Sequence, residues 1–152
     1  MNSIKLQIDL LRELKKGPCG LGRMHEMQAE HFYISDEKGK VLYRVPVYDW
    51  HLSENSFSVP SGISKLIVDM CRLTADDLPL IKTGLIKEHN KEKYYVLAFD
   101  DGTNVYLDAK LARYFSAAVK YYKSKKPGMI KCVEDGEVVA LIGEFVSRCR
   151  EK

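Results

Sequence analysis

Two Asp-Gly pairs, Asp101-Gly102 and Asp135-Gly136, separate short apolar runs in the second half of this 152-residue sequence. An Asp-Gly pair between such runs is the strongest short signal of a β-hairpin, because the tight turn needs residues that tolerate positive φ angles. The apolar runs predict strands over 84–89, 93–99, 104–108, 128–133 and 137–145. Antiparallel hairpins therefore dominate the expected fold.

Another hairpin is expected over residues 31–48, where the turn sequence DEKG separates two apolar runs. Pro46 lies in the second run. Because proline has no N–H group to donate to a neighbouring strand, it predicts a strand end or an edge strand at this point.

Two helices are expected outside the hairpins. The first covers residues 4–16, with Asn2 or Ser3 as its cap and Gly17-Pro18 as its stop. Apolar residues at spacings of three and four predict its core-facing side: Ile4, Ile8, Leu11 and Leu14. A shorter helix is expected over 64–73. Thr74 and Asp77 after it have the spacing of a capping box, although Pro79 limits any helix there to one or two turns.

A third helix is expected over about 108–123, with Asp108 as its cap and Pro127-Gly128 after it. At about 100° per residue, an apolar stripe falls on one side: Leu111, Phe115, Ala118, Val119 and Tyr122. Basic residues fall on the opposite side: Lys110, Arg113, Lys120 and Lys123. Two phenol rings lie between the sides, those of Tyr114 and Tyr121. The helix would therefore pack on a sheet and present a basic surface.

These elements predict an α+β fold, with antiparallel sheets and two or three helices packed on one side. The chain has the length of a single domain, 1–152, and each half (1–60 and 61–152) carries a helix followed by a hairpin. A chain of this length buries enough surface to fold without a disulfide or a metal.

The cysteines do not suggest a disulfide framework. They are scattered through the chain and form no CxxC pair: Cys19, Cys71, Cys132 and Cys149. Charged residues interrupt the N-terminal segment, and no apolar run reaches the roughly 18 residues of a membrane span. We therefore expect a cytoplasmic protein with reduced thiols and no membrane partner.

The distribution of charge is more informative than the net charge of +3. Residues 109–133 contain seven basic side chains and no acidic one: Lys110, Arg113, Lys120, Lys123, Lys125, Lys126 and Lys131. Ordinary surfaces mix the two signs, so this segregation favours a polyanionic partner. The first helix adds three cations on the side opposite its apolar face: Lys5, Arg12 and Lys16.

We therefore expect a non-enzymatic nucleic-acid-binding or replication-accessory protein that contacts the phosphate backbone of DNA or another polyanion. The bordering tyrosines could stack on unpaired bases or bond to phosphate oxygens. The predicted contact residues are Lys110, Arg113, Tyr114, Lys120, Tyr121, Lys123, Lys125 and Lys126, with Lys5, Arg12 and Lys16. An alternative is a protein-interaction module or inhibitor that docks on an acidic protein, and a homo-oligomer is also open. The remaining alternative has no binding role: the basic residues form a solvated helix face, and the tyrosine rings lie in the core.

Other residue groups give weaker signals for chemistry. Cys19, His25 and His31 offer metal-ligand atoms, but a structural zinc site needs four ligands at tighter spacing. Asp49, His51 and Glu54 could form an acid–base group, although the tryptophan in this loop favours an anchor on the core. Asp100 and Asp101 fit a hairpin turn, and the glycines of GPCGLG lack the spacing of a phosphate loop. We expect no cofactor, no metal and no catalytic residues.

Residues 103–145, TNVYLDAKLARYFSAAVKYYKSKKPGMIKCVEDGEVVALIGEF, resemble the last repeat of DNA sliding clamps. In that family a strand leads into a helix, then a strand and a closing hairpin strand. Residues 104–107 resemble the strand that enters the helix, and residues 136–145 resemble the closing strand. The resemblance covers about the last third of the chain and implies a clamp-like repeat of helix plus hairpins.

In sliding clamps, helices line a central hole and present Lys and Arg to duplex DNA. The resemblance therefore implies that Lys110, Arg113, Lys120 and Lys123 face DNA, with Lys5, Arg12 and Lys16 on a partner helix. A clamp subunit joins several such domains, whereas this chain has the length of one. A phage or mobile-element protein that borrows the fold is one way to account for that difference.

Overall fold

A computed structural model of the chain describes residues 1–16, 24–28, 30–35, 40–52, 69–125 and 128–145. These residues contain one complete α-helix, nine strands and a short 3₁₀ turn. The helix is α1 (Ser3–Lys16), and the 3₁₀ turn is η1 (Val47–Asp49). The strands are β1 (Met24–Gln28), β2 (His31–Ser35), β3 (Val41–Pro46), β4 (Leu78–His89), β5 (Glu92–Ala98), β6 (Asn104–Asp108), β7 (Lys120–Lys123), β8 (Met129–Glu134) and β9 (Glu137–Gly143).

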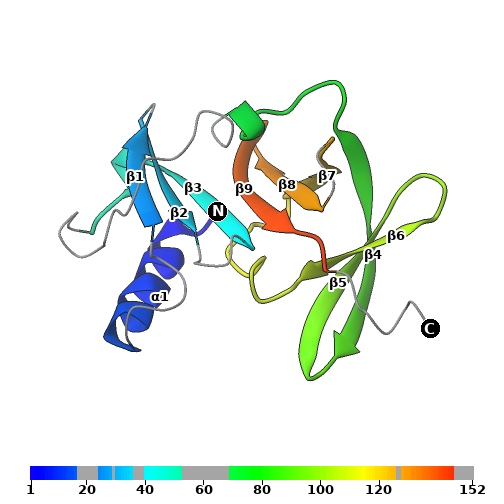
Figure 1. Ribbon diagram of the computed structural model, residues 1–152, viewed down its shortest axis with the longest axis horizontal. Helices are drawn as coiled ribbons and strands as arrows, with labels where there is room; N and C mark the ends of the chain where they lie inside the picture. Colours follow the sequence, from blue (N-terminus) through cyan, green and yellow to red (C-terminus); the bar gives the residue numbers. More distant parts are fainter. Residues whose placement is uncertain (17–23, 29, 36–39, 53–68, 126–127, 146–152) are drawn as a thin grey trace.

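All of these strands belong to one antiparallel sheet with the order β1-β2-β3-β9-β8-β7-β4-β5-β6. The N-terminal strands lie with α1 at one end of the molecule, and the β4–β5–β6 meander lies at the other end (Figure 1). Tyr43 of β3 pairs with Ala140 of β9, so the first and last parts of the chain share one sheet.

The sheet curves back on itself near its last strand. The backbone N–H of Phe145, just beyond β9, donates to the carbonyl oxygen of Tyr106 in β6 at 3.0 Å and forms an isolated antiparallel bridge. This contact joins β9, β8, β7, β4, β5 and β6 into a ring. Ring closure protects strand edges, which otherwise offer unpaired N–H and C=O groups.

The largest core cluster fills this ring and continues under α1. Leu97, Leu107 and Ile142 contribute fully buried side chains from the ring. Leu6 and Leu10 extend the same cluster from α1 toward β3. A second cluster on the other face of the sheet includes Tyr33 and Cys71.

The predicted hairpins are confirmed. The β8–β9 turn has Asp135 and Gly136 at φ angles of 52° and 79°, as a tight two-residue turn requires. β3 ends at Pro46, which confirms the predicted strand end. The antiparallel sheet is therefore correct, but the fold is mostly β, and the expectation of two or three helices is wrong.

The predicted helix over 108–123 is the main error. Residues 109–119 form separate turns, and Lys120–Lys123 form β7. Asp108 does accept a hydrogen bond from the N–H of Lys110, at 2.9 Å, but the chain makes only short turns after it. Tyrosines favour strands, and β7 gains pairing on both sides from β4 and β8. Tertiary pairing therefore overrides the helical spacing of the apolar residues.

The first helix is confirmed, but its core-facing side is not the predicted one. Asn2 is its cap, because the Asn2 Oδ1 atom accepts the N–H of Lys5 at 3.0 Å. Leu6 and Leu10 are fully buried. The predicted apolar face is exposed at Ile4, Ile8 and Leu11. The helix carries two apolar stripes, and the sequence does not say which of them meets the sheet.

The expected helix over 64–73 lies mostly outside the described residues. Thr74 and Asp77, which follow this segment, lie in a turn in which the Asp77 side chain accepts the N–H of Thr74 at 2.8 Å. β4 begins directly after this turn and contains Pro79. No helix within the described ranges is long and apolar enough to cross a membrane.

Candidate binding site

Several basic residues of the segment 109–133, which contains no acidic residue, contact carboxylates from distant parts of the fold. Arg113 contacts Asp9 at 3.0 Å, and Lys123 contacts Glu144 at 2.6 Å. Lys131 is buried and contacts Asp77 at 2.8 Å. A fourth cation, Lys125, lies 3.9 Å from Asp76 at an exposed position. The segregation of charge along the sequence is therefore not preserved in three dimensions.

Asp9 of α1 is the centre of one of these contacts. It accepts hydrogen bonds from the Tyr114 hydroxyl at 2.7 Å and from Arg113, and Arg12 lies 3.7 Å away. The Tyr114 hydrogen bond, with help from Arg113, lowers the pKa of Asp9 despite its partial burial. Tyr114 is buried, its ring is perpendicular to that of Tyr43, and Arg113 lies over the ring at 4.6 Å, so it has no exposed face for a base.

A cleft of about 360 Å³ beside this cluster contains Lys110 and Arg113. Its charged lining residues have mixed signs: Asp9, Glu13, Lys40, Glu92, Asp108, Lys110 and Arg113. Carboxylates outnumber cations in this lining, so the cleft does not favour a polyanion.

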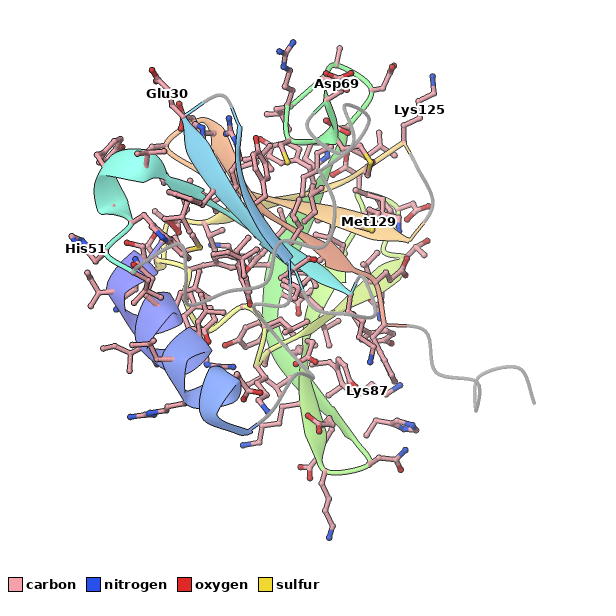
Figure 2. The ribbon with its side chains drawn as sticks, turned by 60° about the vertical axis from the view of Figure 1, so that its left-hand side comes forward. Glu30, His51, Asp69, Lys87, Lys125 and Met129 are labelled. Atoms are coloured by element: carbon pink, nitrogen blue, oxygen red, sulfur yellow. The ribbon has the colours of Figure 1, made fainter. Side chains whose placement is uncertain are left out.

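The other predicted contact residues do not form one surface. Lys5 and Lys120 are exposed, whereas Tyr121 is buried in the core. Lys125 lies on the far side of the molecule from α1 (Figure 2). The side chain of Lys16 and all of Lys126 lie outside the described residues. Of the predicted contact residues that the structure describes, Arg12, Arg113 and Tyr114 are brought together around Asp9, and the backbone carbonyl of Lys110 accepts a hydrogen bond from Arg113.

The remaining candidate groups have structural roles where they are described. The Gln7 side chain donates to the carbonyl oxygen of Asp49 and accepts the N–H of His51, which fixes this loop beside α1 (Figure 2). Trp50 stacks on Phe32 and packs on the core, as predicted. Glu54 and Cys19 lie outside the described residues. No group of three potential metal ligands occurs within the described part of the chain.

The most unusual surface lies on β4 and β5. Five large apolar side chains are exposed there: Leu78, Ile81, Leu85, Ile86 and Tyr95. Leu85 and Ile86 leave 63% and 60% of their surface exposed, and Ile86 pairs directly with Tyr95. Leu85, Ile86 and Tyr95 line one pocket, and we call these three residues the β4 surface; Leu78 and Ile81 do not line it, and Ile81 pairs with Ala98 on the opposite face of the sheet. A soluble protein rarely leaves such side chains adjacent unless the patch has a binding role.

A β-bulge in β4 contributes to the exposure of Leu85. Between the pairs Lys82–Leu97 and Ile86–Tyr95, three residues of β4 face a single residue of β5. Gly84 has φ +78°, and the Thr83 hydroxyl donates to the carbonyl oxygen of Val96 at 2.7 Å. The bulge therefore replaces ladder hydrogen bonds with a side-chain bond and turns Leu85 outward.

The bulge also opens a pocket of about 340 Å³, which we call the bulge pocket. The ladder between β4 and β7 stops at Leu80, so the bulge faces the turns at 112–119 instead of a strand. Buried residues form the floor: Leu97, Ala112, Val119 and Tyr121. Exposed residues form the rim: Lys82, Gly84, Leu85, Ile86 and Ala117.

Among the described residues, Lys82 is the only charged one that lines the bulge pocket. Its ammonium group donates to the carbonyl oxygen of Ala117 at 2.9 Å, from β4 to the opposite wall. It also lies 5.9 Å from the centre of the Tyr121 ring. An apolar pocket with one oriented cation at its rim is chemically suited to an apolar group next to a carboxylate.

The sequence contained a signal for this site. Gly84 interrupts a strand pattern in which the pair Ile-Lys occurs twice, at Ile81-Lys82 and Ile86-Lys87. An isolated glycine inside a strand indicates a bulge. The strand predicted from the sequence begins at Gly84, so that prediction contains neither the bulge nor the pocket beside it.

Comparisons with protein-family models, with curated proteins and with solved structures found no match. The resemblance to sliding clamps therefore receives no support from related proteins. The helix that it implies over 108–123 is also absent.

Proposed function

We propose that this chain is a protein-binding module that uses the β4 surface to contact an acidic partner protein. The supporting observation is the exposure of three large apolar side chains, Leu85, Ile86 and Tyr95, which line one pocket on two adjacent strands. Interfaces are built around such apolar anchors, with charged residues at their rim.

The charge of the β4–β5 hairpin favours an acidic partner. Residues 78–98 contain four lysines, at 82, 87, 91 and 93, and two glutamates, at 88 and 92. Lys87 lies close to the hairpin tip, which projects from the rest of the molecule (Figure 2). Rim lysines of this kind raise the rate of association with acidic surfaces and make it depend on salt.

Binding to nucleic acid remains a prediction with weaker support. A polyanion site needs several unpaired cations on one surface, whereas Arg113 and Lys123 contact carboxylates. The β4 surface adds apolar area rather than a continuous basic groove. A single experiment can separate the two partners.

The test is affinity capture with the full chain immobilised, with and without nuclease treatment, followed by direct binding measurements with each purified captured protein. We expect wild type to bind an acidic protein after nuclease treatment, and Ile86→Asp to lose this binding by at least about tenfold. The introduced carboxylate would be desolvated at the centre of the interface and would repel an acidic partner.

Tyr48→Asp is the matched control, because Tyr48 is 83% exposed on η1, far along the sheet from β4. This variant should bind as wild type does. Capture that disappears on nuclease treatment would favour nucleic acid, and equal binding by wild type and Ile86→Asp would refute the β4 surface. A mass that rises with concentration in wild type but not in Ile86→Asp would identify a second copy as the occupant.

A further inference from the structure

We propose that the bulge pocket recognises one large apolar side chain of the partner and that Lys82 recognises a carboxylate on the next residue. This inference rests on the proposed function and adds the chemistry of the recognised segment. The pocket would therefore read an apolar–acidic residue pair.

The apolar half of this recognition depends on the pocket floor. Leu97, Val119 and Tyr121 are core residues that also line the pocket, so a side chain entering it would contact a surface already fixed by packing. Preformed contacts of this kind reduce the ordering cost of binding. Leu85 and Ile86 at the rim would cover the sides of the inserted group.

The acidic half depends on the position of Lys82. An ammonium group has three donors, and the carbonyl oxygen of Ala117 uses one of them at 2.9 Å. The Ala117 contact holds the cation at the mouth of the pocket. A carboxylate there would accept a further N–H, and none of the described carboxylates lines the pocket to compete for it.

Strand addition along β4 is a less suitable mode of recognition. The edge of β4 toward β7 has no described strand partner beyond Leu80, but the bulge begins at Thr83 and breaks the regular spacing of backbone groups. Bulges are a common means of blocking edge-to-edge pairing. The pocket, rather than the strand edge, therefore carries the specificity.

The experiment uses two capped pentapeptides that differ at one position: phenylalanine followed by aspartate, and phenylalanine followed by asparagine. Binding to the full chain is measured by NMR titration of the methyl signals of Leu85 and Ile86. We expect wild type to bind the aspartate peptide about tenfold more tightly, because a charge-assisted hydrogen bond distinguishes the two. A third peptide, with serine in place of phenylalanine, should not bind.

Lys82→Met is the decisive variant, since methionine keeps an unbranched apolar side chain. It should bind both phenylalanine peptides with the weaker affinity, so the tenfold preference disappears while the apolar contact remains. Lys5→Met is the matched control, because Lys5 is exposed on α1 and does not line the pocket. This control should keep the preference.

A preference that survives in Lys82→Met, or wild type that does not distinguish the peptides, would overturn the assignment of Lys82. Equal binding of the serine peptide would overturn the apolar anchor. If the peptides fail but Ile86→Asp still abolishes capture of the partner, this inference is wrong and the proposed function stands. If Ile86→Asp also leaves partner binding unchanged, the proposed function itself fails.

Discussion

Lys131 and Asp77 form a buried ion pair that holds the turn before β4 against β8. Their side chains are 5% and 1% exposed, and Lys131 also donates to the carbonyl oxygen of Arg72. Asp77→Asn should lower the free energy of unfolding by about 3–5 kcal/mol, because it leaves a buried ammonium without its counter-charge. Urea denaturation at pH 7 measures this difference.

Asp76→Asn provides the control for that measurement. Asp76 is adjacent in sequence, but its contact with Lys125 is exposed on both sides and spans 3.9 Å. An exposed ion pair contributes little, so this variant should change stability by less than about 0.5 kcal/mol. Similar losses in both variants would contradict the structural role of the buried pair.

The same ion pair predicts how stability depends on pH. Burial raises the pKa of Asp77, but hydrogen bonds from Lys131 and Thr74 outweigh it and hold the pKa below the ordinary 3.8. Because the unfolded carboxylate takes up a proton first, the stabilisation is complete above about pH 4 and is lost as pH falls through the folded-state pKa. The stability difference between wild type and Asp77→Asn should therefore be constant above about pH 4 and shrink as the pH falls further. A constant difference over a series of urea denaturations that extends below this pH would refute this origin.

At the scale of single elements, the β4 bulge depends on a left-handed residue. Gly84 has φ +78°, and an added Cβ would have open space around it. Gly84→Ala should therefore lower stability by about 1–2 kcal/mol through backbone strain alone. Gly84→Asn should cost less, since asparagine tolerates this conformation better. Equal stability of all three proteins in thermal unfolding would show that the bulge does not require this backbone.

Hairpins could be predicted from the sequence because their signals are local. Asp135-Gly136 specifies its own turn, and the apolar runs on either side pair with each other through that turn. Asn2 could likewise be predicted as a cap, because its partner is the N–H three residues later. These contacts depend on a few neighbouring residues.

The elements that the sequence misassigned depend on distant residues. β7 exists because β4 and β8 pair with it on both sides, although its sequence also fits a helix. Arg113 is neutralised by Asp9, which is 104 positions away. No sequence window contains both members of such a pair, so the basic surface was overestimated. The bulge pocket was missed for the same reason, since its two walls come from β4 and residues 112–119.

At the scale of the whole molecule, ring closure depends on one residue beyond the last strand. The Phe145 ring stacks on Tyr94 with 4.0 Å between ring centres, while its backbone N–H bonds to Tyr106. The side chain of Phe145 packs on a cluster of buried residues from β5 and β6: Tyr94, Val96 and Tyr106. Phe145 therefore combines an aromatic contact with the only described bridge between the end of β9 and β6.

In Phe145→Ala, the ring of strands should open more readily between the end of β9 and β6, while the rest of the protein stays folded. The loss of one aromatic pair and its burial should cost about 1–2 kcal/mol. Because the contact is local, amides of β6 should exchange with solvent faster, whereas those of α1 should keep their protection. His89→Ala is a graded control. The ring centres of His89 and Phe145 are 5.6 Å apart, so the loss of this looser contact should have a smaller effect. Uniform acceleration across both elements would mean that the sheet opens as one unit, and unchanged β6 exchange would mean that Phe145 does not close the ring.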